Sequence, residues 1–313
     1  MVQLERGNLT CREPMDRHVS WRAGGVAARC YAPRNRQDLI SFVTDRPGSE
    51  MLYVVGLGSN LLVRDGGLDA TVVLMHGALR ETEVNHDGTH GTLLDVEAGV
   101  AAPKVARMAG RMGLEGAEFL AGIPGTLGGA LAMNAGCYGS QTWDHVVSVM
   151  TLDRNGKVRV RQPDDYDIGY RHVALKEVVT GGLEPGGEWF LSARLAFTPG
   201  SAARAREKMR DLLSRRVATQ PLDQPNAGSI FRNPEGGFAA RLIESCGLKG
   251  ARVGQAQVSP RHANFIVNLG GATASDIESL ILEVQEEVWA RQGVKLVMEV
   301  RIVGQSEKQA EVA

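Results

Sequence analysis

The sequence predicts a protein of about two domains that contains both helices and strands. At 313 residues, the chain is longer than one typical domain and can bury a sizeable core. Segments of alternating apolar residues, typical of strands, are interspersed with segments of helical periodicity. A run rich in helix breakers, "TQPLDQPNAGS" from residue 219, separates a long polar helix from a C-terminal part that again mixes helices and strands. We therefore predict a boundary near residue 219.

Short patterns predict the elements of the N-terminal part. "GGVAARCYAP" predicts a strand, and "RQDLISFVTD" (36–45) predicts a helix with three apolar residues on one face. "MLYVVGLGSNLLV" predicts a strand, a turn and a strand, and alternation over residues 71–97 predicts further strands around the polar turn "NHDGTHG". Pro103 occupies a favoured first-turn position of a predicted helix that ends at Gly113.

The remaining elements follow in the same way. "DHVVSVMTLD", "RNG" and "KVRVRQ" predict a hairpin, and residues 201–218 predict a helix with a basic outer face. Beyond the boundary we expect a helix "FAARLIES", a strand "ANFIVNLG", a helix at 275–292 and a final strand "VKLVMEVRIVG". The residues after Gly304 are expected to form a frayed polar tail.

Composition limits the possible functions. A net charge of -1, with 43% hydrophobic and 23% charged residues, is that of an ordinary soluble globular protein and does not favour nucleic-acid or membrane binding. The four cysteines lie far apart without a CxxC pair, which argues against a structural zinc site or a disulfide framework. The N-terminus carries charges where a signal peptide would be apolar, so we expect a cytoplasmic protein.

A long stretch between Phe119 and Trp143, "FLAGIPGTLGGALAMNAGCYGSQTW", carries no charged side chain. Its length would suit a membrane-spanning helix, but its many glycines weaken a helix and Pro124 breaks one. The stretch instead offers backbone N–H groups and few side chains, so a bulky ligand can approach it closely. Tight packing of small residues in a core is the alternative.

A second glycine-rich segment, "VVGLGSNLLV", lies earlier in the chain. It places Gly56, Gly58, Ser59 and Asn60 in a tight turn whose successive amides can form a nest for a phosphate; a plain hairpin is the alternative. The segment does not match the Rossmann fingerprint, because Leu61 takes the last glycine position and a strand follows. Two uncharged glycine-rich loops in one chain suit a long phosphate-bearing ligand such as a dinucleotide.

Other chemistries find less support. His86 and His90 are spaced i, i+4, but a turn glycine lies between them, so we expect no metal site. The nucleophile elbow GxSxG is absent, since Ser229 has a glycine only before it. Acidic residues interleave with the basic ones on the helix at 201–218, so a solvated face is favoured over a nucleic-acid site.

Three further motifs, "GYRHVALK", "PNAGSIFRNP" and "EVRIVG", follow the two glycine loops in this order, and "SWRAGG" precedes them. Together the motifs resemble the UDP-N-acetylenolpyruvoylglucosamine reductase family, also called UDP-N-acetylmuramate dehydrogenase, over residues 20–304. The resemblance implies an α+β flavoenzyme with a vanillyl-alcohol-oxidase/PCMH-type FAD-binding fold of two subdomains and a C-terminal α/β substrate domain. It further implies non-covalent FAD, NADPH as co-substrate, a UDP-sugar substrate of peptidoglycan precursor synthesis, and a monomer.

The domain limits implied by the resemblance are 18–200 for the FAD-binding domain, with subdomains at about 18–70 and 71–200. A connecting helix at 201–218, a substrate-binding domain at 219–306 and a polar tail at 307–313 follow. The FAD-binding residues are expected in the two glycine loops. They are Gly56, Gly58, Ser59, Asn60, Gly122, Ile123, Pro124, Gly125, Thr126, Gly128, Gly129 and Asn134.

The resemblance also implies catalytic residues. Ser229 corresponds to the family's proton donor, and Arg171 and Glu299 to the pair that polarises the substrate carboxylate. The expected substrate contacts are Tyr170, Asn233 and Lys249.

The sequence departs from the family at three places. Leu57 stands where many members have a glycine, Val173 stands where a serine is frequent, and no tyrosine-bearing insertion is evident between Arg171 and Ser229. What closes over the substrate is therefore not predicted. Two other functions stay open: an FAD-dependent oxidase of the same fold acting on an alcohol, sugar or hydroxy acid, and a non-catalytic flavin- or nucleotide-binding module.

Overall fold

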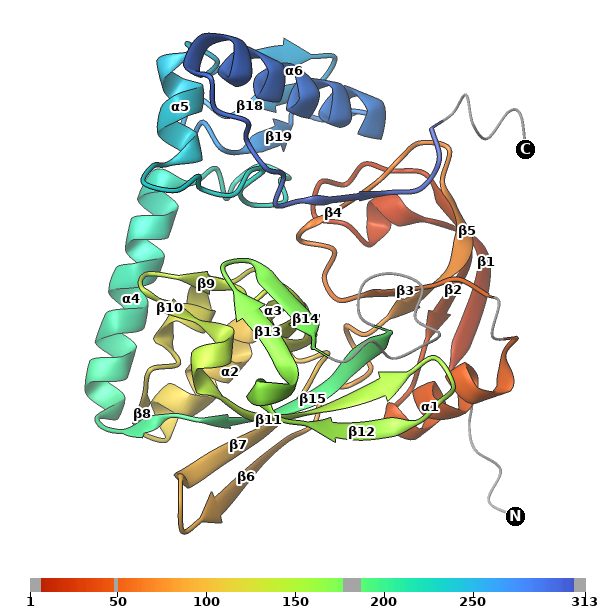
Figure 1. Cartoon of the computed structure of the whole chain (residues 1–313), viewed down its shortest axis with the longest axis vertical. Coiled ribbons are helices and arrows are strands. Elements are labelled where there is room, and N and C mark those ends of the chain that lie inside the picture. Colours follow the sequence, from red (N-terminus) through yellow and green to blue (C-terminus); the bar gives the residue numbers. More distant parts are fainter. Residues whose placement is uncertain (1–6, 48–49, 177–186, 307–313) are drawn as a thin grey trace. The chain divides into compact units, whose positions relative to one another are not determined.

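The computed structural model describes residues 7–47, 50–176 and 187–306, and Figure 1 traces its elements along the chain. Two compact units can be separated. The first comprises Met1–Thr10, Cys30–Leu57 and Thr71–Arg215, and the second comprises Cys11–Arg29, Gly58–Ala70 and Arg216–Ala313. The predicted tail at 307–313 lies outside the described residues.

A five-stranded antiparallel sheet in the order β12-β11-β15-β7-β6 forms the centre of the first unit. Its strands are β6 (Thr82–Asp87), β7 (Gly91–Glu97), β11 (Val146–Asp153), β12 (Val158–Arg161) and β15 (Glu188–Ala196). The apolar faces of α2 (Ala102–Arg111) and α3 (Leu127–Ala132) share one buried cluster with residues of this sheet. Burial of this cluster is the main stabilising contribution of the unit.

Smaller elements complete the first unit. A second cluster joins α1 (Arg36–Asp45), β3 (Leu52–Val55) and part of β5 (Leu68–Leu74), and β3 runs parallel to β5. The helix α1 begins where the Asn35 side chain accepts a hydrogen bond from the amide of Asp38 at 2.9 Å. The other short elements are β8 (Leu114–Glu115), η2 (Glu118–Gly122), β9 (Gly136–Cys137), β10 (Ser140–Gln141), η3 (Thr142–His145), η4 (Pro163–Asp165), β13 (Tyr166–Gly169), β14 (His172–Leu175) and β16 (Thr198–Pro199).

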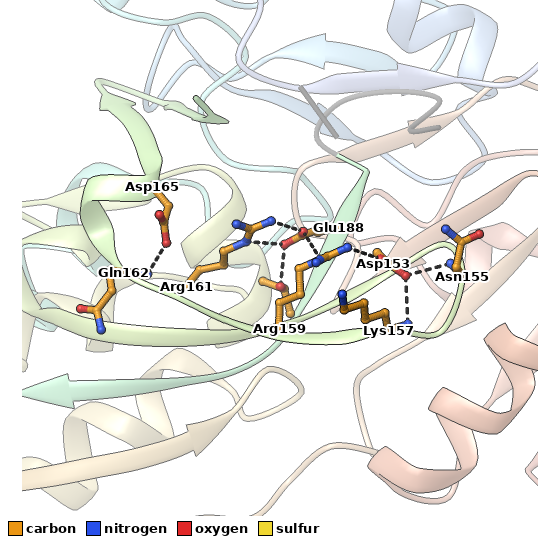
Figure 2. A network of polar contacts seen from close by, with 9 residues as sticks. Asp153, Asn155, Lys157, Arg159, Arg161, Gln162, Asp165 and Glu188 are labelled. Atoms are coloured by element: carbon orange, nitrogen blue, oxygen red, sulfur yellow. Dashed lines mark hydrogen bonds and ion pairs between the residues drawn. The ribbon is translucent and has the colours of Figure 1, made fainter. Parts of the chain in front are cut away.

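A charged network ties the edge of this sheet together (Figure 2). Glu188 is almost fully buried and lies 2.7 Å from Arg161 and 3.2 Å from Arg159, while the hydroxyl of Thr151 donates to it at 2.6 Å. Arg159 also pairs with the buried Asp153 at 2.9 Å. Because each buried carboxylate is paired, the network fixes β12 on β11 and β15.

The second unit has a core of its own. The helices α5 (Ala239–Ser245) and α6 (Ala274–Gln292) share a buried cluster with the three-stranded antiparallel sheet β17 (Arg252–Val253), β18 (Ala256–Val258) and β19 (Ile266–Asn268). Trp21, from the "SWRAGG" motif, is fully buried in this cluster, and its indole N–H donates to Ile266 at 2.8 Å. The strand β4 (Leu61–Val63) pairs in parallel with β20 (Arg301–Val303). The unit also contains η1 (Met15–Arg17).

Four elements carry residues of both units. They are β1 (Asn8–Pro14), β2 (Val26–Ala32), β5 and α4 (Ala202–Thr219). The strands β1, β2 and β5 belong with β3 to one sheet in the order β1-β2-β5-β3. The compact units thus differ from the predicted domain limits, which stay a prediction.

The structure confirms the predicted helices at 36–45, 103–113, 201–218, 238–245 and 275–292 to within two residues. The hairpin after residue 144 is also confirmed by β11 and β12. The prediction of one long final strand is wrong. Within that segment, only Arg301–Val303 forms a strand, and Met298 before it makes an isolated β-bridge to Phe231.

Candidate active site

The first glycine loop connects two strands that do not pair with each other. β3 pairs with β5, and β4 pairs with β20, so the plain-hairpin alternative is wrong. Gly58 has φ +59°, and a Cβ there would overlap the carbonyl oxygen of His18, so only glycine fits without strain. The amide of Ser20 donates to the Gly58 carbonyl at 3.2 Å, which fixes the loop within the second unit.

The two glycine-rich segments meet within the first unit. A Cβ on Gly56 would overlap Oγ1 of Thr126, and Cγ2 of Thr126 would lie 3.2 Å from it. Gly56 therefore allows the end of β3 to lie directly against the start of α3. Thr126 is the N-cap of this helix, and its hydroxyl accepts from the amide of Gly129 at 3.4 Å.

The second segment does not form one long helix, as the glycines and Pro124 predict, but a series of short elements. One of these elements, α3, is helical even though it includes Gly128 and Gly129. Backbone bonds hold its start in place: Leu127 donates to Val100 at 2.8 Å and Gly128 donates to Ala98 at 2.9 Å. Tertiary contacts thus stabilise a helix that the glycines alone would weaken.

The same helix has one crowded and one open glycine. A Cβ on Gly128 would lie 3.0 Å from that of Ala98, whereas a Cβ on Gly129 would meet only Oγ1 of Thr126, at 3.8 Å. Gly129 therefore leaves uncharged space beside the helix start that a side chain would fill. Because no side chain covers the backbone at Gly129, a bulky ligand such as FAD can approach it closely there.

Earlier in this segment, Ile123 is 8% exposed, and a Cβ on Gly122 would lie 3.1 Å from the thiol of Cys137. The carbonyl of Gly125 accepts a hydrogen bond from Ala102 at 2.9 Å. The segment is therefore held against α2 by its backbone while remaining without charge.

Arg171 lies at the tip of the β13–β14 hairpin. It has φ +54°, a left-handed conformation that is uncommon for a non-glycine residue. Its guanidinium donates to the carbonyl of Asn134 at 3.2 Å and to that of Gly136 at 2.9 Å, and it lies 5.2 Å from the ring of Tyr170. Tyr170 itself is half exposed. The first unit thus brings Arg171, Tyr170 and the predicted flavin segment together.

The second unit brings together three other predicted residues. The amide of Glu299 donates to the carbonyl of Ile230, the neighbour of Ser229, at 2.7 Å. The side-chain amide of Asn60 donates to the carbonyl of Glu299 at 3.0 Å, and Arg301 donates to the carbonyl of Asn60 at 3.0 Å. Ser229, Glu299 and Asn60 therefore lie on adjacent backbone segments.

The predicted substrate contacts of the second unit have protein partners. The side-chain oxygen of Asn233 accepts from the amide of Ala239 at 3.1 Å, at the start of α5. Lys249 lies 2.6 Å from Glu244. Burial, together with the positive charge of Lys249, lowers the pKa of His262. This part of the unit therefore holds a lysine with a histidine that stays neutral near pH 7.

Asn264, which holds the backbone next to Ser229, was not among the residues predicted from the sequence. Asn264 is 3% exposed, and its side chain bonds both backbone groups of Phe231, accepting from the N–H at 3.0 Å and donating to the carbonyl at 2.8 Å. Its own carbonyl accepts from Ile230 at 3.0 Å. The signal was an asparagine between apolar residues in "HANFIV", a place where a polar side chain must find buried partners.

The second unit also contains a cavity of about 400 Å³ that includes none of the predicted site residues. Arg64 lines it and is satisfied by Glu278, at 2.8 Å, and by the carbonyl of Gly304 at 3.0 Å. The hydrogen bonds that Arg64 donates to the carboxylate of Glu278 raise the pKa of Arg64. We interpret the cavity as the space around a structural ion pair between Arg64 and Glu278.

Among residues 7–47, 50–176 and 187–306, no cluster of three metal-ligating side chains occurs. Within the same ranges, none of the helices is both long enough and apolar enough to span a bilayer.

Comparison with known proteins gives the site its context. Residues 27–161 match the family model of an FAD binding domain, and residues 220–303 match that of the UDP-N-acetylenolpyruvoylglucosamine reductase C-terminal domain. Proteins named UDP-N-acetylenolpyruvoylglucosamine reductase from Thiobacillus denitrificans and Nitrosospira multiformis are 54% and 55% identical to this chain. Each alignment covers 96% of this chain, and 93% and 89% of the respective relatives.

A solved structure of UDP-N-acetylenolpyruvylglucosamine reductase from Thermus caldophilus is also similar. It has a TM-score of 0.76 and 32% identity, and the match covers 95% of this chain and 98% of that one. These matches confirm the predicted α+β class with its FAD-binding fold. The chain therefore belongs to the UDP-N-acetylenolpyruvoylglucosamine reductase family and is an FAD-dependent oxidoreductase.

Proposed function

We propose that the protein reduces the enolpyruvyl group of UDP-N-acetylglucosamine enolpyruvate to give UDP-N-acetylmuramate, with NADPH as the hydride source. The family and the two matched domains support the reaction class. The product is a precursor of peptidoglycan, so the activity would serve cell-wall synthesis and, through it, cell shape and division. We place it in the cytoplasm, acting as a monomer.

One observation carries the proposal. In the second unit, Glu299 donates its amide to the carbonyl next to Ser229 at 2.7 Å, and Arg232 donates to Val297 at 2.8 Å. These bonds hold the segment of Ser229 and the segment of Glu299 side by side. A hydroxyl and a carboxyl on adjacent segments suit a reaction that delivers a proton to a carbon where negative charge develops.

The chemistry follows from the substrate. FAD, held by the two glycine loops, would supply a hydride, which would add to the methylene carbon of the double bond. The electron pair of the double bond then moves to the carbon that carries the carboxylate. Ser229 would donate its hydroxyl proton to this carbon, which completes the addition of H⁻ and H⁺.

Two side chains would stabilise the charge before the proton arrives. The guanidinium of Arg171 would bind the substrate carboxylate, onto which the electron pair delocalises. Glu299 would act on the same carboxylate as a protonated or hydrogen-bonding partner. Tyr170, Asn233 and Lys249 would hold the nucleotide sugar.

The test is to measure the two half-reactions separately. Ser229→Ala removes the proposed proton donor, so anaerobic flavin reduction by NADPH should keep its rate. Flavin reoxidation by the enolpyruvyl substrate should slow by roughly 10²–10⁴-fold, the range of a positioned general acid. Stopped-flow flavin absorbance measures both halves. Ser245→Ala is the matched control, because that hydroxyl donates to Leu242 at 2.8 Å at the exposed end of α5.

Two results would contradict the assignment. Equal slowing of both halves in Ser229→Ala would make the serine structural. Unchanged reoxidation would mean that the proton comes from another group or from water. The Ser245→Ala control should match the unmodified protein in both halves.

A further inference from the structure

We propose that Asn134, expected from the sequence to bind FAD, is the positioning residue for Arg171: its buried side chain holds the hairpin that carries this arginine against the flavin segment. The inference rests on the proposed function, in which Arg171 binds the substrate carboxylate. It concerns the first unit alone.

The contact between Asn134 and the hairpin is made by two hydrogen bonds that run in opposite directions. The side-chain amide of Asn134 donates to the carbonyl of Gly169 at 3.0 Å. The guanidinium of Arg171, two residues further along, donates back to the main-chain carbonyl of Asn134 at 3.2 Å. Gly169 is the last residue of β13, and it pairs with His172 across the hairpin tip. The two bonds therefore fix both the strand end and the arginine head group.

A third bond fixes Asn134 itself. Its side-chain oxygen accepts from the main-chain amide of Trp143 at 3.2 Å, and the residue is fully buried. Trp143 is 6% exposed and packs on Tyr166, the first residue of β13, with 4.8 Å between ring centroids. One carboxamide thus joins η3, the flavin segment and the hairpin.

Asparagine satisfies both the backbone and the hydrogen-bonding demands of this position. The position has φ +40°, where asparagine and aspartate are tolerated far better than other side chains. Its partners are one backbone N–H and one backbone carbonyl, so the side chain must both accept and donate. Aspartate keeps the acceptor for Trp143 but faces the carbonyl of Gly169 with a second acceptor.

Arg171 needs this support because its own backbone is strained. A left-handed non-glycine residue persists only where its surroundings hold it in place. Displacing the guanidinium by about 1 Å would slow a step that depends on its position by roughly 10²-fold. We therefore expect Asn134 to affect flavin reoxidation by the substrate and not flavin reduction by NADPH.

The experiment is a double-mutant cycle on the flavin-loaded protein. The variants are Asn134→Asp, Arg171→Ala and the double variant, with Asn268→Asp as matched control. Asn268 is 4% exposed and likewise accepts from backbone amides while donating to a backbone carbonyl, that of Trp21 at 2.9 Å. Stopped-flow absorbance gives reoxidation and reduction rates per bound flavin.

Asn134→Asp should slow reoxidation by roughly 10²-fold in the presence of Arg171 and by less than about threefold in Arg171→Ala, because its effect passes through the arginine. Equal slowing in both backgrounds, or none with Arg171 present, would overturn the proposal. If Arg171→Ala itself leaves reoxidation unchanged, the proposed role of Arg171 fails instead.

A second measurement is independent of activity and of bound flavin. Amide hydrogen exchange of residues 166–175 should become faster in Asn134→Asp, or in Asn134→Gly if the aspartate variant does not fold, and stay unchanged in Asn268→Asp. Unchanged exchange at the hairpin in the Asn134 variant refutes the link between Asn134 and the hairpin.

Discussion

The two adjacent glycines of α3 allow flavin binding to be separated from fold stability. Gly129→Ala and Gly128→Ala add the same methyl group one residue apart. At Gly129 the new Cβ would meet only the hydroxyl of Thr126, at 3.8 Å, an ordinary contact. At Gly128 it would lie 3.0 Å from the Cβ of Ala98 and 3.2 Å from its carbonyl oxygen, so the neighbours must shift.

These distances predict opposite effects on the flavin-free protein. Alanine in place of a helical glycine stabilises by roughly 0.5–1 kcal/mol, and Gly129→Ala should show this gain because nothing opposes it. Overpacking at Gly128 costs about 1–3 kcal/mol, which exceeds the helix gain, so Gly128→Ala should be less stable. For FAD affinity we expect the opposite order, with the larger loss in Gly129→Ala. A methyl on Gly129 fills space assigned to FAD, and a tenfold loss of affinity, about 1.4 kcal/mol, is the smallest effect we expect.

The assay compares thermal unfolding of the flavin-free proteins, followed by circular dichroism, with FAD titration followed by flavin fluorescence. Gly129→Ala should unfold at the same or a higher temperature and bind FAD at least tenfold more weakly. Gly129→Val should lose more FAD affinity because its side chain is larger. Full flavin occupancy and unchanged affinity in Gly129→Ala would refute the reasoning, since the open face of α3 would then lie away from the cofactor.

Three further predictions concern the first unit. Glu188→Gln removes the carboxylate partner of Arg161, while Arg159 keeps Asp153 at 2.9 Å, so stability should fall by about 3 kcal/mol, the lower end of the range for a broken buried pair; an unchanged melting temperature would contradict this. The hydroxyl of Tyr166 is buried without a hydrogen-bond partner among the described residues, so Tyr166→Phe should leave the melting temperature unchanged or raised, and a decrease would contradict this. Burial lowers the pKa of His145, so the unfolded state takes up a proton that the folded state excludes, and stability should decline as the pH falls below about 6.5. His145→Phe should flatten this decline in urea unfolding measured between pH 8 and pH 5, and an equally steep decline would contradict the assignment.

Helices could be predicted because their signals are local. The helix at 275–292 was read from apolar periodicity, and the structure ends it where Gly293 adopts a left-handed C-cap with φ +67°. Its start is a capping box in which Thr273 and Asp276 exchange side-chain and backbone bonds. These cap residues lie within the segment itself or one turn from it, although the distant Asp65 also accepts from the amides of Ala274 and Ser275, at 3.0 Å and 2.8 Å.

The misread segments depend on distant partners. Residues 294–300 alternate like a strand, yet Met298 makes only an isolated bridge to Phe231, and Glu299 donates to Ile230. The partner segment lies about seventy residues earlier, so alternation alone could not fix how much of the segment enters a ladder. The short helix α3 shows the reverse case, since two glycines disfavour it and tertiary bonds from Leu127 and Gly128 support it.

The candidate site residues could be predicted from motifs, but the hydrogen bonds that their side chains make could not. The motifs named Asn60 and Asn134 as flavin-loop residues, and both lie in the predicted loops. Their side-chain amides are directed elsewhere: Asn60 donates to the carbonyl of Glu299 at 3.0 Å, and Asn134 donates to that of Gly169 at 3.0 Å. These bonds join residues far apart in the sequence, and no pattern within either loop specifies them.

The two asparagines suggest why each glycine-rich loop is not made of small residues alone. Glycines allow the backbone to approach a large cofactor, but they provide no side chain to bond neighbouring segments. A carboxamide both donates and accepts, and asparagine also tolerates the left-handed backbone at Asn134. Within each unit, one asparagine therefore ties a predicted flavin loop to the segment that carries Glu299 or Arg171. The proposed cofactor binding and the placement of the polar residues would then depend on the same backbone, so we expect a change that loosens either loop to disturb both.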